Sequence, residues 1–119
     1  MAKVLVIEDD GLLRDSIVNL LTMRGVTAIA AENGDLGLKF ARENILDLIL
    51  CDVRMPGLSG YEVLKLLRQD PNTADIPLIF LTAENTPEVT AQGAELGANG
   101  YLCKPFSTTE LMRAIAPFV

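Results

Sequence analysis

The residues of this chain most capable of chemistry are carboxylates, a hydroxyl and an amine, and each group directly follows a short apolar run. They are Glu8, Asp9 and Asp10 after residues 4–7, Asp52 after residues 48–51, Thr82 after residues 78–81, and Lys104 after residues 100–103. Apolar runs of this length are typical of strands buried on both faces, as a parallel sheet requires. The carboxyl ends of parallel strands share one edge of the sheet, where ligands bind. We therefore expect these groups to meet in one cleft, at a reaction site without histidine.

Strand signals alternate with helix signals five times along the chain. We expect strands at residues 4–7, 27–31, 48–52, 76–81 and 100–103, and helices at residues 12–24 and 34–44, between Ser59 and Asp70, between Thr86 and Gly97, and from Ser107 to Phe118. Ser59 with Glu62, and Ser107 with Glu110, form capping boxes that begin two of the helices. With right-handed crossovers this order predicts an α/β fold, a central parallel sheet with helices on both faces. Periodicity alone leaves the order of the strands open.

The composition is that of a single globular domain over residues 1–119, with a net charge of −6. An acidic chain without a basic stretch is a poor nucleic-acid ligand, because phosphate binding needs a basic face. The longest apolar runs are too short to cross a bilayer. Met1, Ala2 and Lys3 lead directly into a strand rather than into a signal peptide, so we expect a cytoplasmic location.

The chain contains no histidine and two cysteines, Cys51 and Cys103. Without histidine, Ser-His and Cys-His nucleophile systems are excluded. Strand alternation turns each cysteine to the face opposite its neighbouring site residue. We interpret both cysteines as small buried hydrophobic residues in a reducing compartment. A disulfide between them is not expected, because we expect another strand to lie between theirs.

Four motifs, in this order and at these separations, resemble those of a response-regulator receiver domain, the phospho-acceptor half of two-component signalling. They are residues 6–10, residues 51–57, residues 81–83 and residues 104–106. The resemblance covers the whole chain. It implies a flavodoxin-like, doubly wound sheet of five parallel strands in the order 2-1-3-4-5.

The resemblance implies that Asp52 is the phosphoryl acceptor, and a carboxylate can act as a nucleophile toward phosphorus to give an acyl phosphate. Crowded carboxylates beside Asp52 repel one another, and a divalent cation removes that repulsion. Mg²⁺ prefers oxygen ligands and usually takes one or two carboxylates. We expect Asp9 and Asp52 to bind it directly and Glu8 to act through water. The family also uses the backbone carbonyl two residues after the acceptor, which here is Arg54. Asp10 is interpreted as the N-cap of the first helix.

The resemblance also assigns roles to a lysine and two switch residues. Lys104 would balance the charge of the phosphoryl group from the side opposite the metal. Its bond to Pro105 is cis in the family. Thr82 would hydrogen-bond the phosphoryl group, and Tyr101 would fill the space that Thr82 leaves. Phosphorylation adds nearly two negative charges, which would bias this pair of states.

Arg54 and Glu84 lie two positions after Asp52 and Thr82, where family members flank the path of the hydrolytic water. We hypothesise that they pair across this path and make self-dephosphorylation slow. The fourth helix, from Pro87 to Leu96, contains no lysine or arginine. The phosphorylation-driven dimer of winged-helix regulators relies on a basic residue there, so a dimer of that type is less expected.

The function that follows is that of a switch phosphorylated by a sensor histidine kinase or a phosphotransfer protein. Its output would be binding of an effector protein or domain through the fourth helix, fifth strand and fifth helix, as a monomer or a weak phosphorylation-dependent homodimer. It would catalyse only its own phosphorylation and dephosphorylation. An aspartate-nucleophile phosphatase would carry an acid where Arg54 stands, and a nucleotide or flavin binder would carry a glycine-rich or Ser/Thr-rich loop after the first strand. The remaining alternative is a pseudo-receiver that binds partners without phosphorylation.

Overall fold

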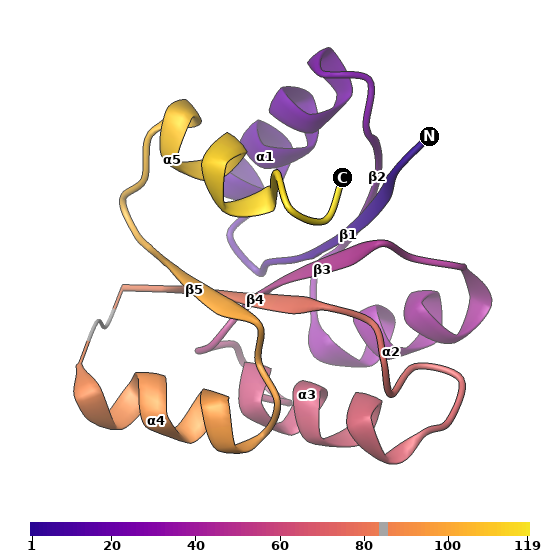
Figure 1. Cartoon of the computed structure of the whole chain (residues 1–119), viewed down its shortest axis with the longest axis vertical. Helices are drawn as coiled ribbons and strands as arrows, with labels where there is room; N and C mark the ends of the chain where they lie inside the picture. Colours follow the sequence, from indigo (N-terminus) through magenta and orange to yellow (C-terminus); the bar gives the residue numbers. More distant parts are fainter. Residues whose placement is uncertain (84–85) are drawn as a thin grey trace.

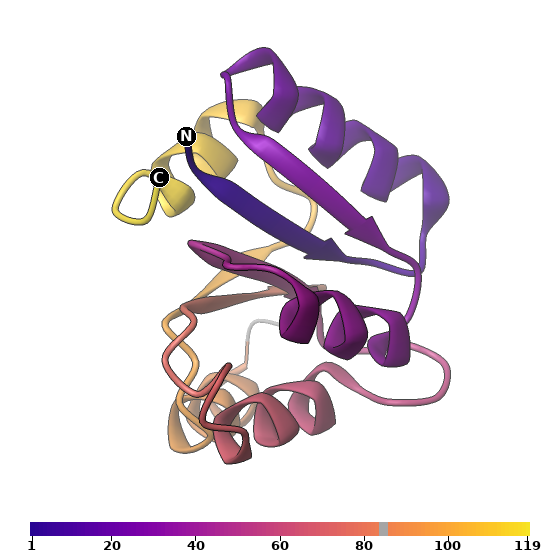
Figure 2. The ribbon, with the colours of Figure 1, turned by 90° about the vertical axis from the view of Figure 1, so that its right-hand side faces the viewer.

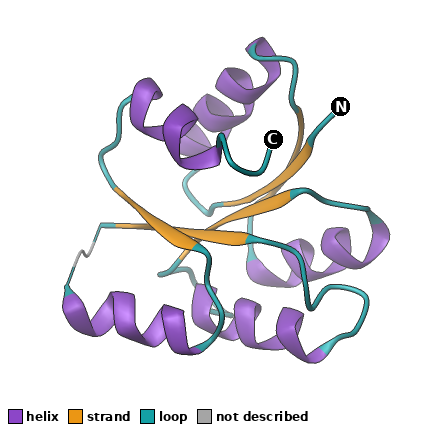
Figure 3. Cartoon of the chain, viewed as in Figure 1, coloured by secondary structure: helices purple, strands orange, loops and turns teal. Residues whose placement is uncertain are grey.

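The computed structural model describes residues 1–83 and 86–119, and its strands and helices alternate along the chain. Figure 1 labels these elements and Figure 3 separates helices from strands by colour. The strands are β1 (Lys3–Ile7), β2 (Thr27–Ala31), β3 (Leu48–Asp52), β4 (Leu78–Thr82) and β5 (Gly100–Cys103). The helices are α1 (Gly11–Met23), α2 (Gly34–Glu43), α3 (Gly60–Gln69), α4 (Pro87–Glu95) and α5 (Thr108–Ile115).

All four strand pairings are parallel, and the strands lie in the order β2-β1-β3-β4-β5. The doubly wound, flavodoxin-like α/β fold with the order 2-1-3-4-5 is therefore confirmed. The order reverses direction at β1, so the connections after β1 and β3 leave toward opposite sides of the sheet. Such a switch point opens a crevice at the carboxyl ends of the strands.

The sheet separates two hydrophobic cores because successive side chains of a strand point to opposite faces. In β3, for example, Leu48 and Leu50 pack with α1 and α5, whereas Ile49 and Cys51 pack toward α2 and α3. Figures 1 and 2 show α1 and α5 on one side of the sheet and α2, α3 and α4 on the other. Every residue of β3 and β4 is buried, as the uninterrupted apolar runs predict.

The caps predicted from the sequence are present. Ser59 with Glu62, and Ser107 with Glu110, form reciprocal capping boxes at α3 and α5. The Asp10 side chain accepts from the amides of Leu12 and Leu13 and is the N-cap of α1. These contacts satisfy amides that the first turn of a helix leaves without partners.

Helices α1 and α4 are both followed by a glycine in the left-handed region. Gly25 has φ +77° and Gly97 has φ +92°, a conformation that costs glycine little because it lacks a Cβ. Gly97 thus reverses the chain between α4 and β5, which brings β5 beside β4.

Two predicted boundaries were wrong by a few residues. Strand β4 begins at Leu78 rather than Ile76, because the Ile76 amide donates to the Thr73 carbonyl at 3.2 Å in a turn. Helix α5 ends at Ile115, and the Phe118 amide donates to the Ile115 carbonyl at 2.9 Å in a final turn. Phe118 still packs, half-buried, against the core beside α1 and α5.

The two cysteines differ in burial. Cys51 is fully buried, as expected, but Cys103 is exposed, so its assignment as a buried residue was wrong. The cause is position: β5 is the edge strand and leaves its last residue uncovered. Both thiols are free, and β4 separates their strands as predicted. No helix in the described part of the chain is long and apolar enough to cross a membrane.

Candidate functional site

The candidate site lies at the carboxyl edge of the sheet, where four strand ends bring distant residues together. Asp52, the last residue of β3, pairs in register with Leu81, and the Val53 amide donates to the Leu81 carbonyl at 3.1 Å. Thr82 pairs with Cys103, and the Lys104 amide donates to the Thr82 carbonyl at 2.7 Å. This register places the Asp52 carboxylate, the Thr82 hydroxyl and Lys104 on neighbouring strands at the same height.

The Lys104 ammonium joins two of the acids. Its Nζ lies 3.0 Å from Asp52 Oδ2 and 2.7 Å from Glu8 Oε1. Glu8 is fully buried and Asp52 is 7% exposed, so both carboxylates depend on protein groups rather than on water to offset their charge. The cis peptide bond between Lys104 and Pro105 is present as expected.

Glu8, Asp9 and Asp52 form a cluster whose ligand oxygens lie within 4.8 Å of one another. These donors are all carboxylate oxygens, the type that Mg²⁺ prefers. Glu8 Oε1 is fully buried and faces the Lys104 ammonium at 2.7 Å, and the same ammonium also contacts Asp52. One ammonium cannot neutralise three neighbouring carboxylates, and a divalent cation beside the cluster would reduce the repulsion between them. The donor set therefore fits a magnesium ion, with the exposed Asp9 open toward solvent.

Burial dominates the protonation equilibria of the site. Burial, and then the hydrogen bond with Asp52, raise the pKa of Glu8 from 4.5 to about 7 against the opposing effect of Lys104. Burial alone would lower the pKa of Lys104, but its contacts with Glu8 and Asp52 outweigh burial and raise that pKa. The lysine is therefore charged near neutral pH, while the acids carry more negative charge than a single ammonium can neutralise.

The loop between β1 and α1 is held by its own main chain and by one arginine. The Glu8 amide donates to the Ala31 carbonyl at 3.0 Å, and Glu8 Oε2 accepts from the Asp10 amide at 3.2 Å. Arg14 Nη1 donates to the Glu8 carbonyl at 2.8 Å. Sequence reasoning missed Arg14. The signal available was its isolation, since it is the sole lysine or arginine between Lys3 and Arg24.

The two predicted switch residues lie where the strand register puts them. Thr82 ends β4 and is 4% exposed. Tyr101 pairs in register with Phe80, and their ring centroids lie 5.6 Å apart. The Tyr101 hydroxyl donates to the Thr90 carbonyl of α4 at 3.1 Å. Burial raises the pKa of this phenol, so it remains a hydrogen-bond donor at neutral pH. Tyr101 thus connects the strand beside Thr82 to α4.

Of the predicted pair of Arg54 and Glu84, only Arg54 lies among the residues that the structure describes. Arg54 is exposed, two residues beyond Asp52. Glu84 lies outside the described residues, so the pairing and its effect on dephosphorylation stay predictions. The same holds for the metal contact of the Arg54 carbonyl.

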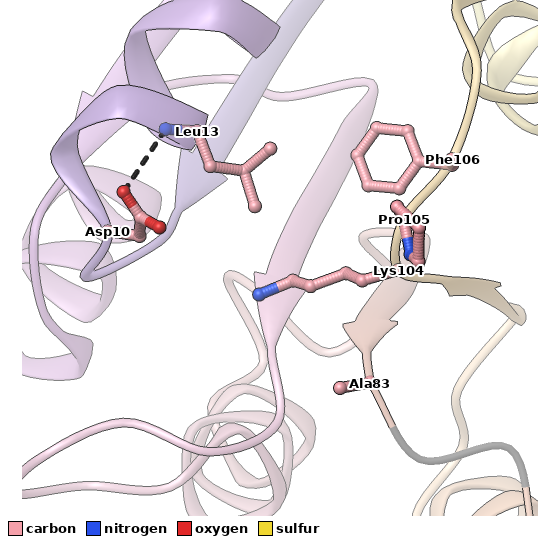
Figure 4. A pocket seen from close by; sticks show the side chains of 6 residues that line it. All are labelled: Asp10, Leu13, Ala83, Lys104, Pro105 and Phe106. Atoms are coloured by element: carbon pink, nitrogen blue, oxygen red, sulfur yellow. Dashed lines mark hydrogen bonds between the residues drawn. The ribbon is translucent and has the colours of Figure 1, made fainter.

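A pocket of about 440 Å³ lies beside the acid cluster. Its lining residues come from the β1–α1 loop, the first turn of α1 and the segments that follow β4 and β5: Asp10, Leu13, Ala83, Lys104, Pro105 and Phe106. Figure 4 shows Leu13 and Phe106 extending toward each other from opposite sides, with the Lys104 chain reaching between them and Ala83. The small side chain of Ala83 leaves this approach to the lysine open.

Gly60 is a second residue that sequence reasoning missed at this site. Its amide donates to the Val53 carbonyl at 2.8 Å, and a Cβ at this position would collide with the Asp52 carbonyl oxygen. The absence of a side chain at Gly60 therefore allows the backbone at the start of α3 to approach the backbone at the end of β3 closely. Its position just after the Ser59 cap was visible in the sequence, but the closeness of the two backbones was not.

Comparisons with known proteins agree with this geometry. The family model described as the response regulator receiver domain matches residues 4–116. The phosphate regulon transcriptional regulatory protein PhoB of Klebsiella pneumoniae is 38% identical over 113 residues, which are 95% of this chain and 49% of PhoB. The chain thus spans about half the length of the curated relatives it matches.

Two solved structures are similar over nearly their full lengths. The chemotaxis protein CheY4 of Vibrio cholerae has a TM-score of 0.96 at 32% identity, covering 100% of this chain and 99% of CheY4. The receiver domain of the sensor histidine kinase PA1611 of Pseudomonas aeruginosa, solved with a magnesium ion coordinated in its active-site cleft, has a TM-score of 0.90 at 29% identity, covering 98% and 96%. On these matches, and with the acids, hydroxyl and lysine gathered at one edge of the sheet, the chain belongs to the response regulator receiver domain family.

Proposed function

We propose that this receiver domain takes a phosphoryl group onto Asp52 from the phosphohistidine of a sensor histidine kinase or a phosphotransfer protein. One observation carries the proposal: the Lys104 ammonium lies 3.0 Å from Asp52 Oδ2 and 2.7 Å from Glu8 Oε1, beside a carboxylate cluster suited to Mg²⁺. Cations on two sides of one carboxylate are what transfer of a phosphoryl group requires, because charge spreads over its equatorial oxygens.

In the proposed reaction, an Asp52 carboxylate oxygen forms a bond to phosphorus as the phosphorus–nitrogen bond of the donor breaks. The electron pair of that bond returns to the donor imidazole, and Asp52 becomes an acyl phosphate. Lys104 then moves its interaction from the carboxylate to the phosphoryl oxygens. Hydrolysis by water restores the carboxylate and releases inorganic phosphate. The protein would act on no substrate other than itself.

Magnesium, when bound, would supply positive charge to the phosphoryl oxygens and cancel the repulsion between the acids. Asp9 and Asp52 are the proposed direct ligands, with Glu8 acting through water and the Arg54 carbonyl as a further ligand. The exposure of Asp9 and the burial of Glu8 support this division. The magnesium ion in the PA1611 receiver domain supports it by relationship.

The proposed output is a change at α4, β5 and α5 that an effector protein or domain reads. Thr82 would turn toward the phosphoryl group, and Tyr101 would move away from its bond with the Thr90 carbonyl into the vacated space. The related PhoB is named as a transcriptional regulatory protein, and this chain matches only 49% of it, so the proposal covers an effector on a separate protein and one in a longer chain. The cytoplasmic location and the monomer or weak dimer remain predictions.

The test is incubation of the protein with acetyl phosphate and Mg²⁺, read by intact-mass spectrometry. We expect the mass gain of one phosphoryl group in the wild type and in Asp35→Asn, which changes an exposed acid of α2. Asp52→Asn should gain nothing, because an amide cannot form the acyl phosphate. EDTA should abolish the gain in every variant.

The alternative, a pseudo-receiver that binds partners without phosphorylation, predicts a different result. The wild type would then show no mass gain at any donor or Mg²⁺ concentration. A gain that survives in Asp52→Asn would also overturn the proposal, because it would place the phosphoryl group on another residue. The chain has the acids and Lys104, and they are in contact, which favours the phosphorylated receiver over the pseudo-receiver.

A further inference from the structure

The guanidinium of Arg14 is bonded to the main chain of the acidic loop. Arg14 lies one turn into α1 and is half-buried. Its Nη1 donates to the Glu8 carbonyl at 2.8 Å, and its own amide donates to the Asp10 carbonyl at 2.9 Å. The amide bond is the ordinary first bond of the helix and would form with any residue, so the contact specific to arginine is the one to the Glu8 carbonyl.

We infer that Arg14 is a positioning residue that presents the acids of this loop to a divalent cation. This inference rests on the proposed function, because it concerns the same magnesium site. Arg14 carries a positive charge and cannot bind the metal itself. Arg14 would act by holding the Glu8 carbonyl. The orientation of this peptide group determines the direction in which the backbone continues to Asp9.

Asp9 is the acid that most depends on such a support. Its side chain is exposed, and none of the described residues donates a hydrogen bond to its carboxylate. Its position is therefore set by the backbone of its two neighbours. Glu8 is held through its amide by the Ala31 carbonyl and through its carbonyl by Arg14, and Asp10 is held as the N-cap of α1.

Arg14 positions the loop through a backbone carbonyl and leaves the carboxylate oxygens of the acids available to a metal. Among residues 1–83 and 86–119, no carboxylate lies in ion-pair range of its guanidinium. An ideal Cβ on Gly11 would lie 3.6 Å from Arg14 Nη2, so the guanidinium runs along the first turn of α1. A neutral side chain here would leave the Glu8 carbonyl to water and the loop free to shift. Loss of a contact that orients metal ligands typically weakens metal binding by about 10- to 100-fold.

The test compares Mg²⁺ affinity, measured by calorimetric titration, in Arg14→Met, Arg14→Lys and Arg24→Met. Arg24 is an exposed arginine at the other end of α1, so Arg24→Met is a matched loss of charge. We expect roughly tenfold weaker Mg²⁺ binding in Arg14→Met. Removing a positive charge near a cation site would by itself strengthen binding, so the two explanations predict opposite signs. Arg14→Lys keeps the charge but loses the planar fork, and we expect an intermediate affinity.

A second measurement follows the loop directly. The Asp10 amide, which donates to Glu8 Oε2, should exchange with solvent several-fold faster in metal-free Arg14→Met than in wild type or Arg24→Met. Unchanged affinity and exchange in both Arg14 variants would overturn the inference. If Arg14→Met fails to fold, Arg14→Lys decides by the same two readouts. Failure of the wild type to bind Mg²⁺ would instead reject the proposed function.

Discussion

At the scale of single residues, the carboxyl edge of the sheet holds more negative charge than its cations neutralise. Glu8 and Asp52 are buried and share Lys104, and Asp9 adds a third carboxylate at the solvent side. The burial of Glu8 raises its pKa to about 7, so the metal-free site takes up a proton that Mg²⁺ would displace. Cys51 lies beside this site, and burial raises the pKa of its thiol so far that it stays protonated and unreactive.

The raised pKa of Glu8 predicts a pH dependence of stability in EDTA. The folded state holds the proton more tightly than the unfolded chain, so this group's contribution is fully present below pH 4.5 and is lost as the pH rises through about 7. Denaturant unfolding of wild type and Glu8→Gln should show this. The unfolding free energy of wild type relative to the variant should fall across that range.

Saturating Mg²⁺ is the control for this experiment, because a bound cation removes the advantage of the protonated acid. With Mg²⁺ bound, the unfolding free energy of wild type relative to Glu8→Gln should no longer fall with rising pH. A difference between the two proteins that does not vary with pH in EDTA would contradict the assignment of the titration to Glu8.

At the scale of elements, α4 packs against the sheet through a glycine. Tyr101 of β5 lies over Gly93, and a Cβ at that position would overlap the Tyr101 hydroxyl and approach Phe80 to 3.1 Å. Just after the end of α4, Arg68 of α3 donates to the Gly97 carbonyl at 2.9 Å and also to the Ile76 carbonyl at 2.8 Å. The helix is therefore tied to the phenol at its centre and to the arginine at its end.

This packing predicts the sign of Gly93→Ala. Alanine normally stabilises a helix interior by up to about 1 kcal/mol relative to glycine. Here the added methyl should destabilise the protein by about 1–3 kcal/mol, because it overpacks the contact with Tyr101. Thermal or denaturant unfolding measures the effect.

Two further variants test the cause. In a Tyr101→Ala background the space is open, and Gly93→Ala should become neutral or stabilising. Gly11→Ala, whose Cβ would meet only Arg14 Nη2 at 3.6 Å, should be tolerated in the wild-type background. Equal destabilisation by Gly93→Ala with and without the tyrosine would show that the phenol is not the obstacle.

At the scale of the whole molecule, the site joins elements from both cores. Glu8 and Asp9 follow β1, and Asp52 ends β3, so one ion at this edge would contact segments far apart in the sequence. The Thr82 hydroxyl ends β4, and Lys104 follows β5. Unfolding must separate all of them. Binding at such a site stabilises the entire fold rather than one loop.

Mg²⁺ should therefore raise the melting temperature of the protein. At about 100 times its dissociation constant, a ligand specific to the folded state adds about 2.7 kcal/mol. For a domain of this size that corresponds to a rise of roughly 10 °C. Differential scanning calorimetry with Mg²⁺, and with Na⁺ at equal ionic strength, measures it. Asp9→Asn should lose most of the rise, and an equal rise with Na⁺ would mean that only screening is at work.

Much of the fold and site was predictable from the sequence because the signals are local. A buried parallel strand needs an unbroken apolar run, so the runs that end at Asp52 and before Lys104 identified both the strands and the shared edge. Asp10, Ser59 and Ser107 cap helices through contacts within three residues. Such patterns do not depend on how the chain packs.

The tertiary structure alone decided what depends on residues far apart in the sequence. Local periodicity did not determine the strand order, which became an expectation only through the resemblance. The exposure of Cys103 and the fit of Gly93 against Tyr101 had no local signal. The isolation of Arg14 was visible in the sequence, but its bond to the Glu8 carbonyl was not. Burial and close approach are properties of packed surfaces, and the pKa of Glu8 follows from burial. The sequence by itself thus determined which groups are available at this edge, and packing decided their charge, their supports and the room around them.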